Sequence, residues 1–190
     1  GYVRAEGAGV VVLRRTDRTL SDGSRSRATL VASGMNSAGR TNGISLPSRE
    51  AQAQLLRSIY DNNGIDPRAL AFVEGHGTGT KVGDPAELWA IGSVLGKVRS
   101  QPLLIGSIKS NIGHAEPASG VLGLIKAVLS LENNYLPASL HAETLNDNVD
   151  FDDLNVEVNR AGRALPRTEE RRLAGVNSFG FGGTNVHVVI

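Results

Sequence analysis

The stretch Leu70-Ala71-Phe72-Val73-Glu74-Gly75-His76-Gly77-Thr78-Gly79-Thr80 joins a short apolar run to a polar loop rich in glycine. Four apolar residues ending at Val73 are typical of a buried strand. The loop after them places a histidine and two threonines among glycines, which allow unusual backbone angles and the close approach of a ligand. Because loops that leave strand ends are common reactive sites in α/β sheets, the stretch predicts a strand that carries His76 into a site.

The same pattern occurs twice more along the chain. Residues 103–108 read as a strand, and the loop 109–114 after it offers Lys109 and His114. Residues 173–179, 180–184 and 185–190 read as a strand, a glycine turn and a strand. Further strands are expected at 9–13, 27–34 and 154–158, with a polar turn at 16–26, a loop at 137–153 and a basic connector at 160–172.

Three helices are expected between these strands. The first is capped by Ser48 and stops near 63–64, the second runs from Asp84-Pro85 to about Leu95, and the third runs from Glu116-Pro117 to 133–134. Gly120 and Gly123 in the third helix indicate close backbone packing, since glycine costs up to about 1 kcal/mol in a helix interior. Alternating strands and helices followed by a hairpin predict a layered α/β fold with a mixed sheet.

Composition narrows the functional class. The 190 residues are 40% hydrophobic, which suits one globular domain with a core. The 20 basic residues against 19 acidic ones argue against nucleic acid or an anionic membrane as partner. The longest apolar stretch, 121–131, contains Lys126 and is too short to span a bilayer, and no signal pattern opens the chain. We therefore expect a soluble cytoplasmic protein, and both ends read as cut from a longer polypeptide.

Several kinds of site find little support. With 0 cysteines the segment offers neither a disulfide, nor a thiolate metal site, nor a cysteine nucleophile. The glycines are misspaced for a dinucleotide or P-loop motif, and His114-Ala115-Glu116 lacks the paired histidines of a zinc helix, so we expect no metal. Taken singly, a loop histidine is more often structural than catalytic.

Taken together, the loops favour acyl chemistry. A helix that begins near Glu116 would place its positive end at His114 and keep that imidazole neutral. Lys109 adds positive charge that would favour neutral histidines or pair with Glu116. Two neutral imidazoles, His76 and His114, could donate N–H groups to the oxygen of an enolate or a tetrahedral intermediate. The hydroxyls of Thr78 and Thr80 could position a thioester arm.

Three motifs, residues 73–80, 106–114 and 177–185, closely resemble those of β-ketoacyl synthases and occur in that family's order. The resemblance extends to Ala5-Glu6-Gly7 and is greatest to the ketosynthase domain of modular, type I polyketide synthases, in its carboxyl-terminal part. It implies half of a thiolase-like layered fold, a mixed sheet flanked by helices. Residues 1–26 would then end the amino-terminal half as a strand and connector, and residues 27–190 would form the carboxyl-terminal half.

The resemblance also implies the chemistry of an acyltransferase that lengthens polyketide or fatty acid chains by decarboxylative Claisen condensation. His76 and His114 match the pair that promotes decarboxylation, and Lys109 matches the lysine that organises them. The implied substrate contacts are Thr78, Thr80, Phe179, the gating Phe181 and Gly182, with Asn111 and Glu116 in support. The substrate would arrive on the phosphopantetheine arm of an acyl carrier protein, with no cofactor bound directly.

The resemblance implies a nucleophilic cysteine upstream of Gly1, in the amino-terminal half of the same ketosynthase, so this segment alone should be inactive. Family members are usually homodimers. Two alternatives remain: a ketosynthase-like structural or chain-length partner that has lost its nucleophile, and a decarboxylating loading ketosynthase. Retention of His76, Lys109 and His114 disfavours the first. Arginines at 160, 163, 167, 171 and 172 could attract an acidic carrier protein or simply be a solvated connector.

Overall fold

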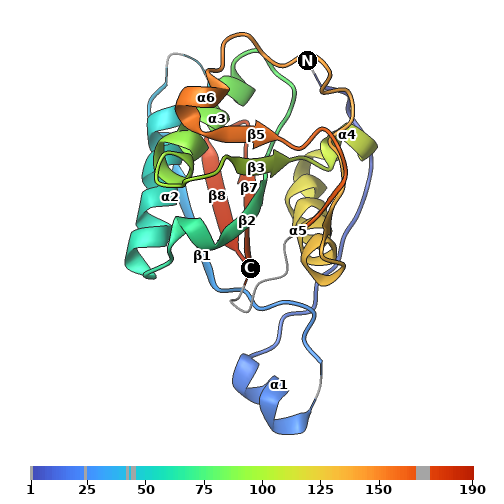
Figure 1. The fold of residues 1–190 in the computed structure, drawn as a ribbon. Coiled ribbons are helices and arrows are strands. Elements are labelled where there is room, and N and C mark those ends of the chain that lie inside the picture. The colour runs from blue at the N-terminus through green and yellow to red at the C-terminus, as the bar shows by residue number, and fades with distance from the viewer. Residues whose placement is uncertain (1, 24, 42, 44–45, 166–171) are drawn as a thin grey trace.

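A computed structural model of the chain describes residues 2–23, 25–41, 43, 46–165 and 172–190. In these ranges a 6-stranded sheet has the order β1-β8-β7-β2-β3-β5 (Figure 1). Its strands are Ala32–Ser37 (β1), Leu70–Glu74 (β2), Leu103–Gly106 (β3), Val156–Val158 (β5), Leu173–Phe179 (β7) and Thr184–Val189 (β8). A separate 2-stranded ribbon pairs β4 (Tyr135–Leu136) with β6 (Arg163–Ala164). The expected mixed α/β sheet is confirmed.

The position of β2 decides where the reactive loops lie. β2 is parallel to both of its neighbours, β3 and β7. β5 continues the parallel part of the sheet beside β3, whereas β8 is antiparallel to both β7 and β1. The carboxyl ends of β2, β3 and β7 therefore meet at one edge of the sheet, and the three glycine-rich loops leave from that edge.

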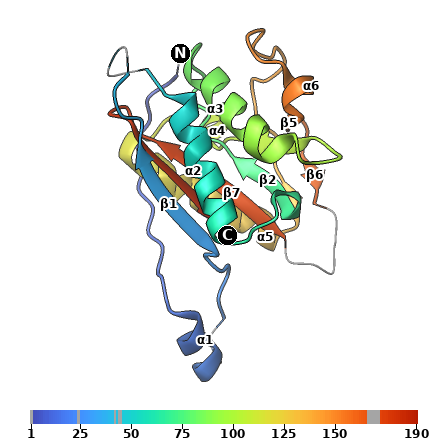
Figure 2. The ribbon, with the colours of Figure 1, turned by 90° about the vertical axis from the view of Figure 1, so that its left-hand side faces the viewer.

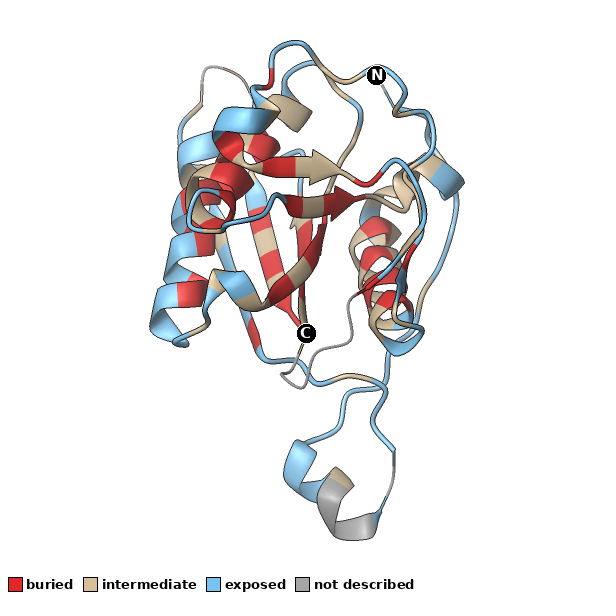
Figure 3. Ribbon diagram, viewed as in Figure 1, coloured by how far each residue is buried: buried red, intermediate tan, exposed pale blue. Residues whose placement is uncertain are grey.

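Helices cover both faces of the sheet (Figures 1 and 2). α2 (Arg49–Asn62) packs on β1 and β8 and contacts α3 (Gly83–Ile91), while α5 (Ser119–Glu132) packs on β7 and β2. Buried apolar residues form one core on each side, and neighbouring residues of β2 divide between them: Val73 joins the α2–α3 core and Phe72 the α5 core. Figure 3 shows the buried residues along the sheet and on the helix faces toward it. No helix of the described residues has the length and apolar content of a membrane span.

The helix ends follow the sequence signals closely. The Ser48 hydroxyl accepts a hydrogen bond from the Ala51 N–H at 3.2 Å and caps α2, as expected. α3 ends at Ile91 and continues as the π-helical turn η2 (Gly92–Gly96), so the expected helix to about Leu95 has two parts. α5 is preceded by the 3₁₀ turn η3 (Glu116–Ala118).

The small face of α5 packs as its glycines predict. A Cβ on Gly120 would lie 2.9 Å from the Ser178 hydroxyl, and one on Gly123 would lie 3.3 Å from Cγ of Glu74. Both glycines therefore let α5 approach the sheet closely, which confirms the packing expected from the sequence.

Several local expectations are wrong, chiefly within residues 1–26. Residues 9–13 form no strand, and Val10 and Val12 are 86% and 91% exposed, because no strand of the described residues pairs with them. The expected turn at 16–26 contains the helix α1 (Thr16–Asp22), where the Asp17 carboxylate accepts from the Arg18 N–H. α1 projects from the rest of the molecule (Figure 1).

The remaining differences are short elements inside expected loops. β1 begins at Ala32, where its pairing with β8 starts, and not at residue 27 as expected. α4 (Lys109–Ile112) and α6 (Phe151–Leu154) lie in the expected loops at 109–114 and 137–153, and η1 (Pro67–Ala69) precedes β2. Part of the expected basic connector, 166–171, lies outside the described residues. One turn of helix buries too few apolar side chains to leave a periodic signal.

Candidate active site

Three rings meet at the carboxyl edge of the sheet, two from the loops after β2 and β3 and one from the end of β7. The imidazoles of His76, after β2, and His114, after β3, are 5.3 Å apart between centroids and cross at 88°. The Phe179 ring, at the end of β7, lies 5.8 Å from the His76 ring. Parallel pairing of β2 with both neighbours brings these residues together although the two histidines are far apart in sequence.

His114 has a defined tautomer. The Glu116 N–H donates to His114 Nδ1 at 2.9 Å, so in the neutral ring the proton lies on Nε2. The pKa of His114 is lowered, first by burial and then by the positive charge of Lys109, against the opposing charge of Glu116. The Glu116 carboxylate itself pairs with Arg4 at 2.7 Å rather than with Lys109. His114 therefore presents Nε2–H as a donor.

His76 is also neutral, for a related reason. Burial, followed by the charges of Lys109 and His114, lowers the pKa of His76 to about 3. Its Nδ1 is buried and has no hydrogen-bond partner in the described part of the chain. Both imidazoles are therefore uncharged near neutral pH, and neither acts there as an imidazolium acid.

A buried carboxylate that sequence reasoning missed holds the His76 loop. Glu87, on α3, accepts the backbone N–H groups of His76 at 2.7 Å and of Gly77 at 2.8 Å. Gly77 has φ +46°, and a Cβ there would lie 2.9 Å from Cβ of Ser107, so the loop needs glycine at this position. The sequence signal that could have revealed Glu87 is its position between Ala86 and Leu88, which are buried with it.

A second buried carboxylate, Glu74, was also missed and holds the His114 loop. Its side chain is 1% exposed, accepts the Ile108 N–H at 2.7 Å and pairs with Lys126 of α5 at 2.6 Å. Burial raises the pKa of Glu74, while the Lys126 ammonium opposes that shift. A lysine inside the apolar stretch of α5 was the signal, because a buried lysine needs an acidic partner.

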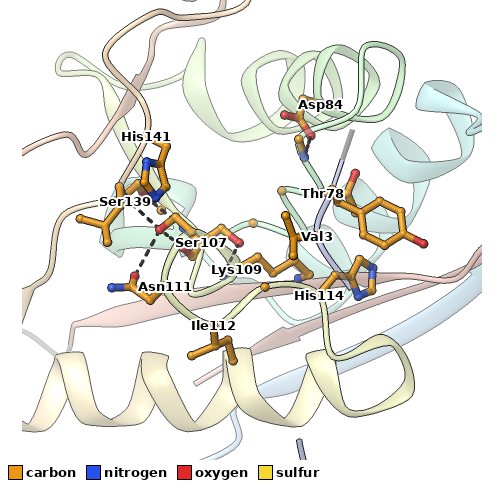
Figure 4. Close-up of a pocket in the computed structure, with 18 of the residues that line it drawn as sticks. Val3, Thr78, Asp84, Ser107, Lys109, Asn111, Ile112, His114, Ser139 and His141 are labelled. Atoms are coloured by element: carbon orange, nitrogen blue, oxygen red, sulfur yellow. Dashed lines mark hydrogen bonds between the residues drawn. The ribbon is translucent and has the colours of Figure 1, made fainter. Parts of the chain in front are cut away.

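A cavity of about 780 Å³ opens beside the two loops. Figure 4 shows Thr78 and His114 on one side of it and Asn111, Ser139 and His141 on the other, with Lys109 between them. Burial lowers the pKa of Lys109, and the charges of Glu87, Glu74 and Asp84 oppose that shift. Thr80 does not line the cavity. Its hydroxyl accepts the Gly83 N–H at 3.0 Å and lies 3.2 Å from the Thr78 hydroxyl.

Chemically, the site combines one cation with two neutral imidazoles, which suits stabilisation of a developing oxyanion. No metal-binding group of three or more His, Cys, Asp or Glu side chains occurs among the described residues. Residues 27–143 match the model of the beta-ketoacyl synthase C-terminal domain. The chain belongs to the β-ketoacyl synthase family.

The similar proteins are polyketide synthases and their ketosynthase domains. The chain is 48% identical over 192 residues to a phenolphthiocerol/phthiocerol polyketide synthase of Mycobacterium tuberculosis, covering 100% of the chain and 10% of that protein. The oxazolomycin ketosynthase domain OzmH KS7 of Streptomyces albus matches with a TM-score of 0.94 at 36% identity, over 100% of this chain and 35% of that one. The module 6 ketosynthase of bacillaene synthase from Bacillus subtilis matches with a TM-score of 0.89 at 38% identity, over 93% of this chain and 32% of that one. This ketosynthase chain thus has the thiolase-like fold and spans about a third of the solved domains.

Not every residue that the ketosynthase motifs single out lies at the histidines. Phe181 is 72% exposed and Gly182 is exposed on the turn between β7 and β8, and neither lines the cavity. Of the five arginines that could attract a carrier protein or be a solvated connector, Arg163 pairs with Glu157, Arg172 bonds Asn134, and Arg160 is exposed. The other two members, at 167 and 171, lie outside the described residues.

Proposed function

We propose that this chain supplies the oxyanion-stabilising half of a condensing ketosynthase, an acyltransferase that extends a polyketide or fatty acid chain. One observation carries the proposal: two neutral imidazoles cross with centroids 5.3 Å apart, and the Glu116 N–H occupies His114 Nδ1, so that Nε2 carries the N–H that can donate. Neutral N–H donors held in place before reaction are what a developing enolate oxygen requires.

The reaction that we propose begins with a malonyl-type thioester. Its carboxylate leaves as carbon dioxide, and the electron pair of the broken carbon–carbon bond becomes an enolate on the thioester. His76 and His114 would donate N–H groups to the enolate oxygen. The enolate carbon would then attack the carbonyl of an acyl-cysteine thioester, form the new carbon–carbon bond and expel the cysteine thiolate.

The nucleophile would come from outside this chain, which has 0 cysteines. We propose that the amino-terminal half of a ketosynthase carries it, consistent with the 35% of a solved domain that the chain covers. A glutamine at the nucleophile position would instead indicate the decarboxylating loading role. The sequence of the complete polypeptide decides between these two.

The cavity beside Thr78 and Lys109 would receive the phosphopantetheine arm of an acyl carrier protein. Its volume of about 780 Å³ lies within the range of ligand pockets, and the Thr78 hydroxyl lines it. Thr80 would act indirectly, because its hydroxyl caps the start of α3 and lies beside that of Thr78.

The sharpest test compares two variants of His114 in a complete ketosynthase that contains this chain. His114→Ala should lower the rate of malonyl-thioester decarboxylation by about 100- to 1,000-fold, as the loss of one oxyanion donor does. His114→Gln keeps an N–H near the position of Nε2 and should retain much more of that rate. Equal losses in both variants would identify His114 as a base rather than a donor, and unchanged rates in both would refute the proposed function.

A further inference from the structure

A chain of buried side chains runs from the hairpin of β7 and β8 to the His76 loop. The Asn177 amide donates to Glu87 Oε1 at 2.8 Å, and its Oδ1 lies 2.6 Å from His187 Nδ1. The Tyr60 hydroxyl of α2 lies 3.2 Å from His187 Nε2. All four side chains are buried, so water does not compete for these hydrogen bonds.

The direction of each hydrogen bond in this chain follows from the one before it. Glu87 already accepts two backbone N–H groups, which can only donate, so it meets Asn177 through the amide nitrogen. The Asn177 oxygen then accepts, and His187 Nδ1 must carry the proton. A neutral imidazole has one N–H, so Nε2 accepts from the Tyr60 hydroxyl. With Glu87 ionised, one arrangement of protons satisfies the whole chain. Burial raises the pKa of Glu87, and the hydrogen bonds from Gly77, Asn177 and His76 oppose that shift.

The fold makes specific room for His187. His187 and Asn177 are direct partners across the antiparallel ladder of β7 and β8. The imidazole lies over Gly175, where a Cβ would come within 2.8 Å of Cε1 of His187. A larger residue at Gly175 would displace the ring. His187 is 0% exposed and contacts no part of the cavity beside Thr78.

We infer that His187 is a positioning residue for His76, acting through Asn177 and Glu87. Only the predicted effect of His187 on the decarboxylation rate rests on the proposed function. Without the His187 N–H, the Asn177 oxygen loses its buried donor, and only Glu87 still orients the Asn177 amide. The amide is then held less firmly, and the hold of Glu87 on the His76 and Gly77 amides weakens. A displacement of about 1 Å at a reacting group can cost 100-fold in rate.

The test compares His187→Leu with His187→Asn in a complete ketosynthase that contains this chain. Leucine fills the volume without an N–H, whereas the asparagine amide keeps a donor near the position of Nδ1. We expect His187→Leu to lower kcat for malonyl-thioester decarboxylation by about 10- to 100-fold with KM little changed. His187→Asn should recover most of that loss.

A second measurement does not depend on activity. Amide hydrogen exchange in a peptide covering His76 and Gly77 should accelerate in His187→Leu and return toward the original rate in His187→Asn, because these amides donate to Glu87. If His187→Leu does not fold, His187→Met fills the same space with a more adaptable side chain and replaces it.

Asn36→Ala is the matched control. It removes the hydrogen bonds that Asn36 makes to Asn185 and to the Ala51 carbonyl, beside the same hairpin but outside the His187 chain. It should lower the thermal midpoint without changing the exchange of the His76 and Gly77 amides.

Equal exchange and equal rates in His187→Leu, His187→Asn and the unaltered protein would overturn the inference. Faster exchange in Asn36→Ala as well would overturn it too, since any loosening of the hairpin would then suffice. If the unaltered protein decarboxylates nothing, the proposed function fails, and the exchange comparison still decides whether His187 positions the His76 loop.

Discussion

At the scale of residues, burial and the charge of Lys109 keep two histidines neutral. His76 is neutral mainly because it is buried, and its pKa is about 3. His114 is less buried, but burial is still the first cause of its lowered pKa, and the positive charge of Lys109 is the second. Its Nδ1 accepts a backbone N–H. The charge of Lys109 thus lowers the pKa of both rings without a hydrogen bond to either in the described structure.

This charge state predicts the pH dependence of the rate. Both pKa values are lowered, so both imidazoles remain neutral donors above the ordinary histidine pKa of about 6.5 and for some distance below it. We expect decarboxylation by the complete ketosynthase to be nearly constant from about pH 8 down to the ordinary histidine pKa of about 6.5, and to fall only in more acidic solution. A twofold loss centred near pH 6.5 in a pH–kcat profile would contradict the neutral pair.

At the scale of elements, one ion pair ties three of them together. Glu74, at the end of β2, bonds the loop after β3 through the Ile108 N–H and bonds α5 through Lys126. The loop that carries His114 is therefore held from the neighbouring strand and from the helix on one face. Gly123 lets α5 come close enough for this contact.

The ion pair predicts an asymmetric response to substitution. Lys126→Met leaves the Glu74 carboxylate buried with no cation, and removing one partner of a buried pair costs about 3–5 kcal/mol. Adding Glu74→Gln to Lys126→Met removes the stranded charge and should recover part of that stability. Thermal unfolding of both variants measures this, and a double variant no more stable than Lys126→Met would contradict the prediction.

At the scale of the whole molecule, neutral buried histidines make stability depend on pH. His76 and His187 both have pKa values of about 3, against about 6.5 in an unfolded chain. Below pH 6.5 the unfolded state binds protons that the folded state does not, so the free energy of unfolding falls as the pH drops toward 3.

His187→Asn removes one of these two groups. Its loss of stability between pH 6.5 and pH 4 should be shallower than that of the unaltered protein by up to about 1.4 kcal/mol per pH unit, the equivalent of one proton. Comparing the two slopes, rather than the absolute free energies, cancels the contribution of the carboxylates to the pH dependence, because both proteins share them. Thermal midpoints measured across this pH range provide the comparison, and parallel slopes would show that His187 does not titrate on unfolding.

Local patterns in the sequence determined the central strands of the sheet and the start of a helix that packs on it. β2, β3, β7 and β8 lie within a few residues of their expected bounds, because short apolar runs between glycines have few other ways to be buried. Ser48 likewise marks the start of α2 correctly. The strand predicted at residues 9–13 is wrong. Their apolar run is typical of a strand, but a strand also needs a pairing partner, which the described residues do not supply.

The family motifs and the identities of His76, Lys109 and His114 were therefore available from the sequence alone. Tertiary structure decided the rest: the parallel pairing that sets the histidine rings 5.3 Å apart, the tautomer of His114, and the buried carboxylates Glu74 and Glu87. Local patterns reflect burial and turn geometry within a few residues. Which distant donor meets a buried carboxylate depends on how strands and helices pack, and a sequence carries no local record of that.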